Sequence, residues 1–87
     1  LWAETKAWVL LCWAQTAALL GEPARAAEAY GCLLAWRGTP YRARERARKL
    51  SAELAPRLDA ETLAAATARG STRPAEEVIA EIVAPGS

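Results

Sequence analysis

The sequence predicts an all-α fold of about five helices, and three observations support this prediction. Hydrophobic residues make up 53% of the 87 residues, with Ala, Leu and Trp far more frequent than β-branched residues, and this composition favours helix over strand. Apolar residues recur at spacings of three and four along most of the chain, which is the period of a helix. Gly, Pro and Asp lie between the periodic stretches, where helices begin and end. We therefore expect one helical-repeat domain over residues 1–87.

The first expected helix, residues 3–20, is apolar on almost every side. One face carries Leu10, Trp13, Ala14, Ala17 and Leu20, and a second stripe carries Trp8, Leu11, Cys12 and Leu19. A helix with two apolar faces must be covered on two sides. The chain begins without Met directly in apolar residues, as a fragment of a longer protein would. We therefore expect the second face to meet an adjacent repeat or a second copy of the chain, through the side chains of Trp2, Trp8 and Leu11.

The second and third helices are expected at residues 23–36 and 40–55. Gly21 can adopt the left-handed conformation that ends a helix, and Pro23 suits the first turn of the next. Thr39 is the expected N-cap of the third helix, with Pro40 at its first position. The apolar face of the second helix is formed by Ala26, Ala27, Tyr30, Leu33 and Leu34, and the narrow seam of the third by Ala43, Ala47, Leu50 and Leu54.

Two shorter helices are expected after Pro56. Asp59 is the expected N-cap of a fourth helix that reaches residue 69, and Gly70 is the expected C-terminal cap. The last helix begins near residues 71–74, with acidic residues in its first turn, and ends at Pro85. The apolar residues expected to be buried are Leu58 and Leu63 in the fourth helix and Val78, Ile79, Ile82 and Val83 in the fifth.

Residues 3–37 resemble one tetratricopeptide unit, a helix-turn-helix of 34 residues. The residues that carry the resemblance, and that we expect in the repeat core, are Leu10, Trp13, Ala14, Gly21, Ala26, Tyr30 and Leu33. Ala17 departs from the pattern, because an aromatic residue is usual there. A second repeat over residues 40–83 matches poorly, with Arg44, Arg48 and Ser51 at core positions. We therefore expect one repeat-like hairpin followed by a degenerate capping set of helices.

Residues 18–83 also resemble the C-terminal end of the helical-repeat arm in large LuxR-type and antibiotic-regulatory NTPase transcriptional regulators of the actinobacterial type. The resemblance rests on four blocks, residues 20–27, 38–40, 63–70 and 76–80. It implies a cytoplasmic, signal-sensing arm that binds protein and restrains the rest of a transcriptional regulator.

The residue types that catalysis or cofactor binding needs are scarce. The sequence contains no histidine, no GxxxxGK[ST] phosphate loop and no GxSxG motif. Adjacent Glu76 and Glu77 point about 100° apart on a helix and do not converge. The spacing of Cys12 and Cys32 matches no metal site, so we expect buried, reduced thiols. The chain is therefore predicted to be no enzyme and to need no cofactor or metal.

The longest apolar stretch, residues 7–20, is shorter than the ~20 residues that span a bilayer. It also lacks the basic leader and cleavage site of a signal peptide. We therefore expect a cytoplasmic protein without a membrane partner.

The conspicuous polar feature is a block of six basic residues and one acid with a local charge of +5, formed by Arg37, Arg42, Arg44, Glu45, Arg46, Arg48 and Lys49. Arg42, Arg44, Arg46, Arg48 and Lys49 could contact phosphates or an acidic partner. Nucleic-acid binding is not the favoured interpretation, because the basic residues flank the apolar seam on both sides and little aromatic surface lies among them. The block could also be a solvated face, or could pair with the last two helices, since residues 50–87 carry a net charge of −3.

Four tryptophans, Trp2, Trp8, Trp13 and Trp36, leave open a third interpretation, a pocket for a small apolar molecule. A repeat core with one uncovered end explains them more simply. The favoured function is a protein-interaction or signal-sensing helical module, followed by a nucleic-acid-contacting module and then by a ligand-binding bundle.

Overall fold

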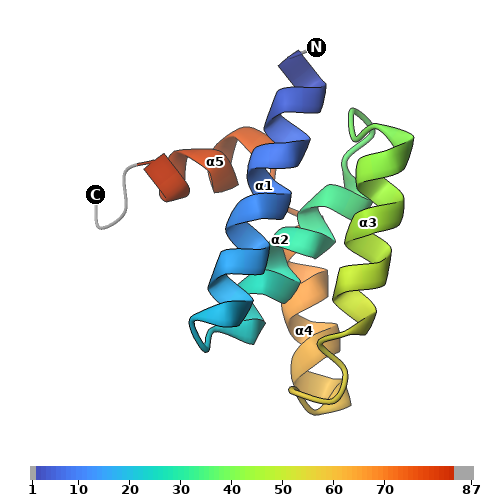
Figure 1. The fold of residues 1–87 in the computed structure, drawn as a ribbon, viewed down its shortest axis with the longest axis vertical. Helices are drawn as coiled ribbons and strands as arrows, with labels where there is room; N and C mark the ends of the chain where they lie inside the picture. Colours follow the sequence, from blue (N-terminus) through green and yellow to red (C-terminus); the bar gives the residue numbers. More distant parts are fainter. Residues whose placement is uncertain (1, 84–87) are drawn as a thin grey trace.

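The computed structural model describes the backbone of residues 2–83 and the side chains of residues 4–81. This part of the chain forms five helices and no strand, which confirms the all-α prediction (Figure 1). The helices are α1 (Trp2–Leu19), α2 (Pro23–Ala35), α3 (Tyr41–Ala52), α4 (Ala60–Ser71) and α5 (Ala75–Val83).

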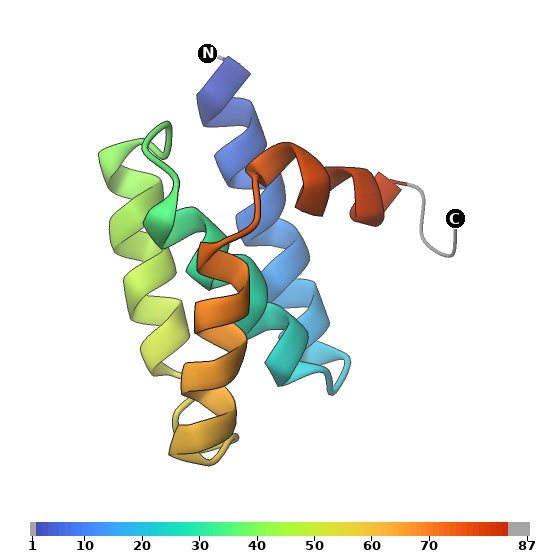
Figure 2. The same ribbon diagram turned by 180° about the vertical axis from the view of Figure 1, so that it is seen from behind.

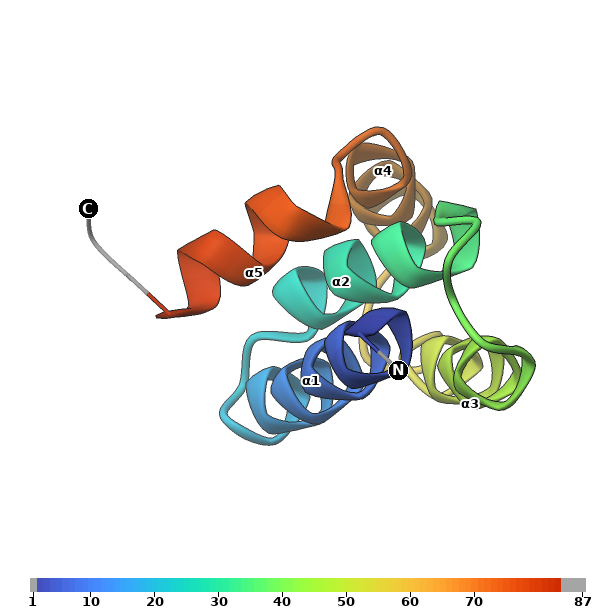
Figure 3. The same ribbon diagram turned by 90° about the horizontal axis from the view of Figure 1, so that it is seen from above.

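The second helix is the centre of the fold. Seen from above, α1 and α3 lie side by side on one side of α2, and α4 lies on the other side (Figure 3). The short α5 lies against α1 and α2, and the view from behind shows it leading away from the end of α4 (Figure 2). α3 and α4 follow each other in sequence, yet each packs on α2 and neither packs on the other.

The core follows from this arrangement, because α2 is covered on several sides. Seven of its thirteen residues are buried. α1 contributes Leu10, Leu11 and Ala14. Of the predicted seam, Ala43 and Ala47 are buried and Leu50 is partly buried in α3, and Leu54 is buried in the turn after the helix, which ends at Ala52 and not at residue 55. In the last two helices Val78 is buried, and Leu63 and Ile79 are partly buried against the core. Leu58 is also partly buried, but it lies before α4 and not in the helix as expected. The side chains of Ile82 and Val83 lie outside the described residues.

The turn between α1 and α2 has the chemistry that the sequence predicts. Gly21 has a φ of +87°, and the N–H groups of Gly21 and Glu22 donate to the carbonyls of Ala18 and Ala17 at 3.3 and 2.9 Å. These two bonds form a Schellman motif, which satisfies carbonyls at the end of the helix. Pro23 begins α2 as expected. The two helices form the hairpin that a tetratricopeptide unit requires, but α3 and α4 form no second hairpin, so the repeat architecture stays a prediction.

The start of α3 differs from the prediction. Thr39 is not the N-cap, because its side chain is buried and its hydroxyl donates to the carbonyl of Leu33 at 2.7 Å. Pro40 is the N-cap residue, and the helix begins at Tyr41. The hydroxyl of Thr39 therefore satisfies a carbonyl in the last turn of α2 and caps that helix instead of the next one.

The predicted role of Gly70 as a C-terminal cap is also wrong. α4 continues to Ser71, and Gly70 is buried inside the helix. A β-carbon at Gly70 would lie 2.7 Å from the carbonyl carbon of Glu28, and one at Gly31 would lie 3.0 Å from the Cα of Thr67. The two glycines therefore allow the backbones of α2 and α4 to approach closely.

The N-terminus of α4 confirms the prediction for Asp59. Its carboxylate accepts hydrogen bonds from the N–H and the hydroxyl of Thr62, at 3.2 and 2.6 Å. These bonds favour the charged form and lower the pKa of Asp59.

Candidate protein-interaction surface

The outward side of α1 carries an uncovered apolar stripe. Trp8, Cys12 and Leu19 project within about 40° of one another and extend over about 16 Å of the helix. Trp8 is 38% exposed and Leu19 is 86% exposed, and the thiol of Cys12 is also exposed. We call these three residues the α1 stripe. Exposed apolar surface of this kind is typical of interaction sites.

The structure separates the residues that were expected at this interface. Trp8 lies on the exposed stripe, and the side chain of Trp2 lies outside the described residues. Leu11 is only 1% exposed, so its assignment to a partner interface is wrong. The reason is the position of α3, which packs beside α1 and leaves Leu11 on the inward side of the helix.

The two cysteines differ from each other. Cys12 is exposed, so the prediction of a buried thiol is wrong there, and it holds for Cys32. The thiol of Cys32 donates to the carbonyl of Arg73 at 3.4 Å. Burial raises the pKa of Cys32, because the thiolate is poorly solvated inside the fold.

The expected repeat-core residues are otherwise placed as predicted. Leu10, Ala14, Ala26, Tyr30 and Leu33 are all buried. Burial first, and then the charge of Glu53, raises the pKa of Tyr30. Trp13 is only partly buried, and the guanidinium carbon of Arg25 lies 5.4 Å from the centre of its ring, as in a cation–π contact.

A groove runs beside the α1 stripe, between α1 and α3. Its volume is about 270 Å³, and its lining is Gln15, Ala18, Leu19, Tyr30, Leu50, Glu53, Leu54 and Arg57. The guanidinium of Arg57 donates to the carbonyl of Ala18 at 2.7 Å, which joins the segment after α3 to the end of α1. We call this feature the α1–α3 groove.

The basic residues of α3 have two different roles. The guanidinium of Arg44 donates to the carbonyls of Leu34 and Trp36, the latter at 2.9 Å, so it caps the end of α2. Arg48 pairs with Glu45 on the same helix. Both side chains are thus occupied by contacts within the chain.

The other basic residues of α3 are Arg42, Arg46 and Lys49. All three are exposed, and they form no ion pair with another described residue. Their spacing of four and three residues places them within about 60° on the helix. Arg44 and Arg48 lie on the other side of the seam, as the sequence interpretation expects. We call Arg42, Arg46 and Lys49 the α3 basic edge.

The α3 basic edge lies beside the α1–α3 groove. The charge of Arg46 lowers the pKa of Tyr30, against the raising effects of burial and Glu53. Glu53, which lines the groove, follows Arg46 by seven residues and Lys49 by four, so it lies on the same face of α3 as the basic edge. Ala18 and Leu19 of α1 and Leu50 of α3 thus line the groove, and the cations of the basic edge lie next to it on α3.

Pairing of α3 with the last two helices, one of the alternatives for the basic block, is not observed. α3 contacts neither α4 nor α5. The acids of α5 are held by other residues, since Glu76 pairs with Lys6 at 3.0 Å, and Glu77 and Glu81 pair with Arg73.

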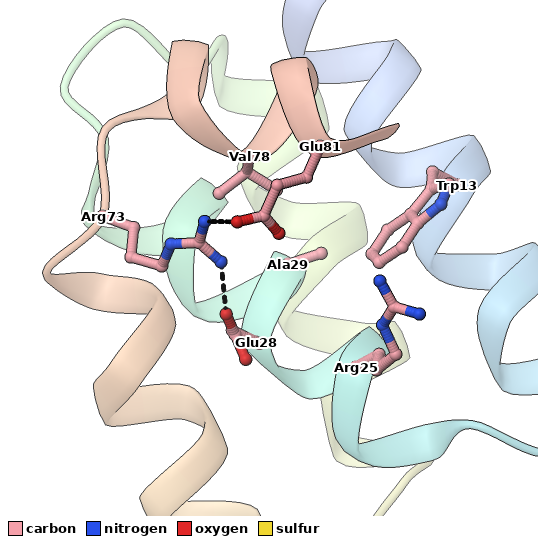
Figure 4. A pocket seen from close by; sticks show the side chains of 7 residues that line it. All are labelled: Trp13, Arg25, Glu28, Ala29, Arg73, Val78 and Glu81. Carbon is pink, nitrogen blue, oxygen red and sulfur yellow. Dashed lines mark hydrogen bonds and ion pairs between the residues drawn. The ribbon is translucent and has the colours of Figure 1, made fainter. Parts of the chain in front are cut away.

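Arg73 organises the contact between α5 and α2, and the sequence interpretation did not identify it. It lies in the turn before α5 and pairs with Glu28 of α2 at 2.6 Å and with Glu81 (Figure 4). It also pairs with Glu77 at 3.0 Å. The hydrogen bond from Arg73 lowers the pKa of Glu81, and that from Lys6 lowers the pKa of Glu76. The spacing of Arg73, Glu77 and Glu81 by four residues is the signal that could have revealed this cluster.

The pocket of Figure 4 is small. Its volume is about 90 Å³, the space of about three water molecules. Its lining is Trp13, Arg25, Glu28, Ala29, Arg73, Val78 and Glu81. A third hollow of about 310 Å³, lined by Thr5, Lys6, Val9, Glu76, Ile79 and Ala80, only reaches the lower limit of pockets for small molecules.

Within the described part of the chain, no three His, Cys, Asp or Glu residues are close enough to hold a metal ion. Glu76 and Glu77 have separate partners. Among the helices that the structure describes, none combines the length and the apolar character needed to cross a bilayer. Comparisons with models of protein families, with curated proteins and with solved structures found no match.

Proposed function

We propose that this chain is a non-catalytic helical module that binds a protein partner through the outward side of α1. The observation that supports the proposal is the α1 stripe, in which Trp8 is 38% exposed and Leu19 is 86% exposed. A monomer gains nothing from exposing such side chains, whereas a partner helix would remove their apolar surface from water. We further propose a role as the signal-sensing arm of a cytoplasmic transcriptional regulator, in which the stripe packs on an adjacent tetratricopeptide-like repeat.

Nucleic-acid binding is the second candidate, because the α3 basic edge presents three exposed cations. Fewer cations are available for it than the sequence predicts. Arg44 and Arg48, two of the five residues proposed for phosphate contact, have partners within the chain. Binding of a small apolar molecule is the third candidate, and the hollows next to α1 and α5 support it only weakly.

Light scattering of the purified chain over a range of concentrations tests the proposed function. The α1 stripe has no partner in a dilute solution of one protein, so two copies should associate through it. Wild type should show a mass that increases with concentration, and Trp8→Glu and Leu19→Glu should both stay monomeric because each places a charge in the apolar contact.

The matched control is Ala65→Glu, which adds the same charge at an exposed position of α4, in the layer on the far side of α2 (Figure 3). It should associate like wild type. A wild-type chain that stays monomeric at every concentration and binds no apolar dye would contradict the proposal.

A further inference from the structure

The C-terminal end of the α1 stripe and the α3 basic edge lie on either side of one groove. α1 and α3 lie side by side and run in the same direction (Figure 1). Leu19 belongs to the α1 stripe and lines the groove, and so does Glu53, which lies on the face of α3 that carries Arg46 and Lys49. One face of the molecule therefore combines apolar and cationic side chains, and this combination restricts the chemistry of its partner.

The charge around the groove is positive. Arg42, Arg46, Lys49 and Arg57 contribute four positive charges, and Glu53 contributes one negative charge, so the local charge is +3. Arg48 lies outside the groove and is neutralised by Glu45. The cations of the basic edge are separated along α3 by about 6 and 4.5 Å.

We propose that the α1–α3 groove binds an amphipathic helix with an acidic edge from a partner protein. The apolar side chains of that helix pack on Trp8 and Leu19, and its carboxylates pair with Arg42, Arg46 and Lys49. This inference rests on the proposed function and names the class of partner for the same surface.

The dimensions fit a helix. The α1 stripe extends over about 16 Å and the basic edge over about 10 Å, and a partner helix with acids at positions i, i+4 and i+7 has the same spacing as the three cations. Binding of an amphipathic helix in a groove between two helices is a common mode of peptide recognition. Complementary charge at the edge would select the partner and its direction.

A nucleic acid fits the same surface less well. The groove is lined by the apolar side chains of Leu19 and Leu50, which gain little from a sugar-phosphate backbone. The α5 helix of a second copy has acidic and apolar residues, but Lys6 and Arg73 already pair with its acids. A separate acidic helix is therefore the occupant that the charges favour.

The test uses fluorescence anisotropy of the full chain with a labelled synthetic peptide of about 18 residues, a helix of about 27 Å. The peptide carries Leu at the a and d heptad positions and Glu along one edge, and matched peptides carry Gln or Lys in place of Glu. The Glu peptide should bind about tenfold more tightly than the Gln peptide, since three exposed ion pairs are together worth about that much. Its affinity should fall as salt is added.

Variants show which side of the groove provides the affinity for the peptides and which provides the preference for Glu. Arg42→Gln combined with Arg46→Gln should remove most of the preference for the Glu peptide, and Leu19→Glu should weaken all the peptides. The matched control is Arg37→Gln combined with Arg48→Gln, which removes the same charge outside the basic edge and should keep the preference. Circular dichroism of each variant checks that the helices are intact.

Three outcomes would overturn the inference. If the Glu and Gln peptides bind equally and both require Leu19, the acidic edge is wrong and the proposed function stands. If no peptide binds while wild type still self-associates, the partner-binding site is the α1 stripe and not the groove. A single-stranded oligonucleotide or an anionic vesicle could instead bind in a way that requires Arg42 and Arg46 but not Leu19. The partner would then be a molecule or membrane that presents phosphate groups.

Discussion

Replacing Gly70 by Ala tests the close contact between α2 and α4. Alanine is the better helix former, by about 0.8–1.0 kcal/mol, so a helix judged alone should gain stability from Gly70→Ala. The fold predicts the opposite sign. The new β-carbon would lie 2.7 Å from the carbonyl carbon of Glu28 and 3.0 Å from the backbone nitrogen of Cys32, and backbone atoms of a packed helix cannot move aside as a flexible side chain can.

The expected loss of stability is the cost of the steric clash minus the gain in helix propensity. Inserting a methyl group into a packed core costs about 1–3 kcal/mol and occasionally more, and a clash with main chain belongs at or above the upper end. After the gain in helix propensity, Gly70→Ala should lower the free energy of unfolding by about 2 kcal/mol. A chain of this length has about 4–13 kcal/mol in total, so the loss is a large share of its stability.

Urea unfolding followed by circular dichroism measures this loss, and the midpoint should fall by about 1–2 M. Gly21→Ala is the contrasting variant, because no atom lies within 4 Å of its β-carbon. It should lose about 1–2 kcal/mol through its φ of +87° alone. A Gly70→Ala protein as stable as wild type would refute the close contact. Gly70→Asn separates the two roles of this residue, since asparagine is tolerated as a C-terminal cap but is too large for the contact.

Three further predictions concern single side chains. A thiol reagent should modify Cys12 within minutes and Cys32 only on unfolding, which mass spectrometry of the labelled peptides would show. Arg73→Met should increase hydrogen exchange in α5 and little elsewhere. Acidification should also increase hydrogen exchange in α5, because the pKa of Glu81 is lowered in the folded chain. The stability that the Glu81 carboxylate contributes is therefore present at neutral pH and is lost as the pH falls below the usual range of a glutamate. Thr39→Val should cost about 1–2 kcal/mol in urea unfolding, since it removes the hydrogen bond to the buried end of α2.

Two of these predictions have a control variant. Arg69→Met removes a charge whose nearest acid is 3.7 Å away, and it should leave the exchange of α5 unchanged. Thr39→Ser keeps the hydroxyl and should retain most of the stability. Equal labelling of the two cysteines in the native chain, uniform exchange changes in Arg73→Met, or a Thr39→Val protein as stable as wild type would each contradict the corresponding contact.

The helix boundaries were largely predictable, because local chemistry sets them. Gly21 ends α1 and Pro23 begins α2 through conformations that few other residues adopt as well. Asp59 caps α4 through a bond to a residue three positions away. Information of this kind lies within a few neighbouring residues, and the sequence displays it directly.

The errors concern contacts between distant segments. The periodicity of α1 shows two apolar stripes, and only the position of α3 decides that Leu11 is buried and Cys12 is exposed. A glycine near the end of a helix resembles a cap, and Gly70 differs only because α2 lies against it. Arg44 resembles Arg42 and Arg46 in sequence, but the end of α2 binds its guanidinium.

The central position of α2 has a consequence for how the chain folds during synthesis. α2 makes its closest contacts with α4, and the pair formed by Gly31 and Thr67 is separated by 36 positions. A ribosome that adds about 5–20 residues per second needs about 2–7 s to make that stretch. During this interval the hairpin of α1 and α2 has one bare flank, and a nascent chain in this state is a natural client for a chaperone that shields apolar surface.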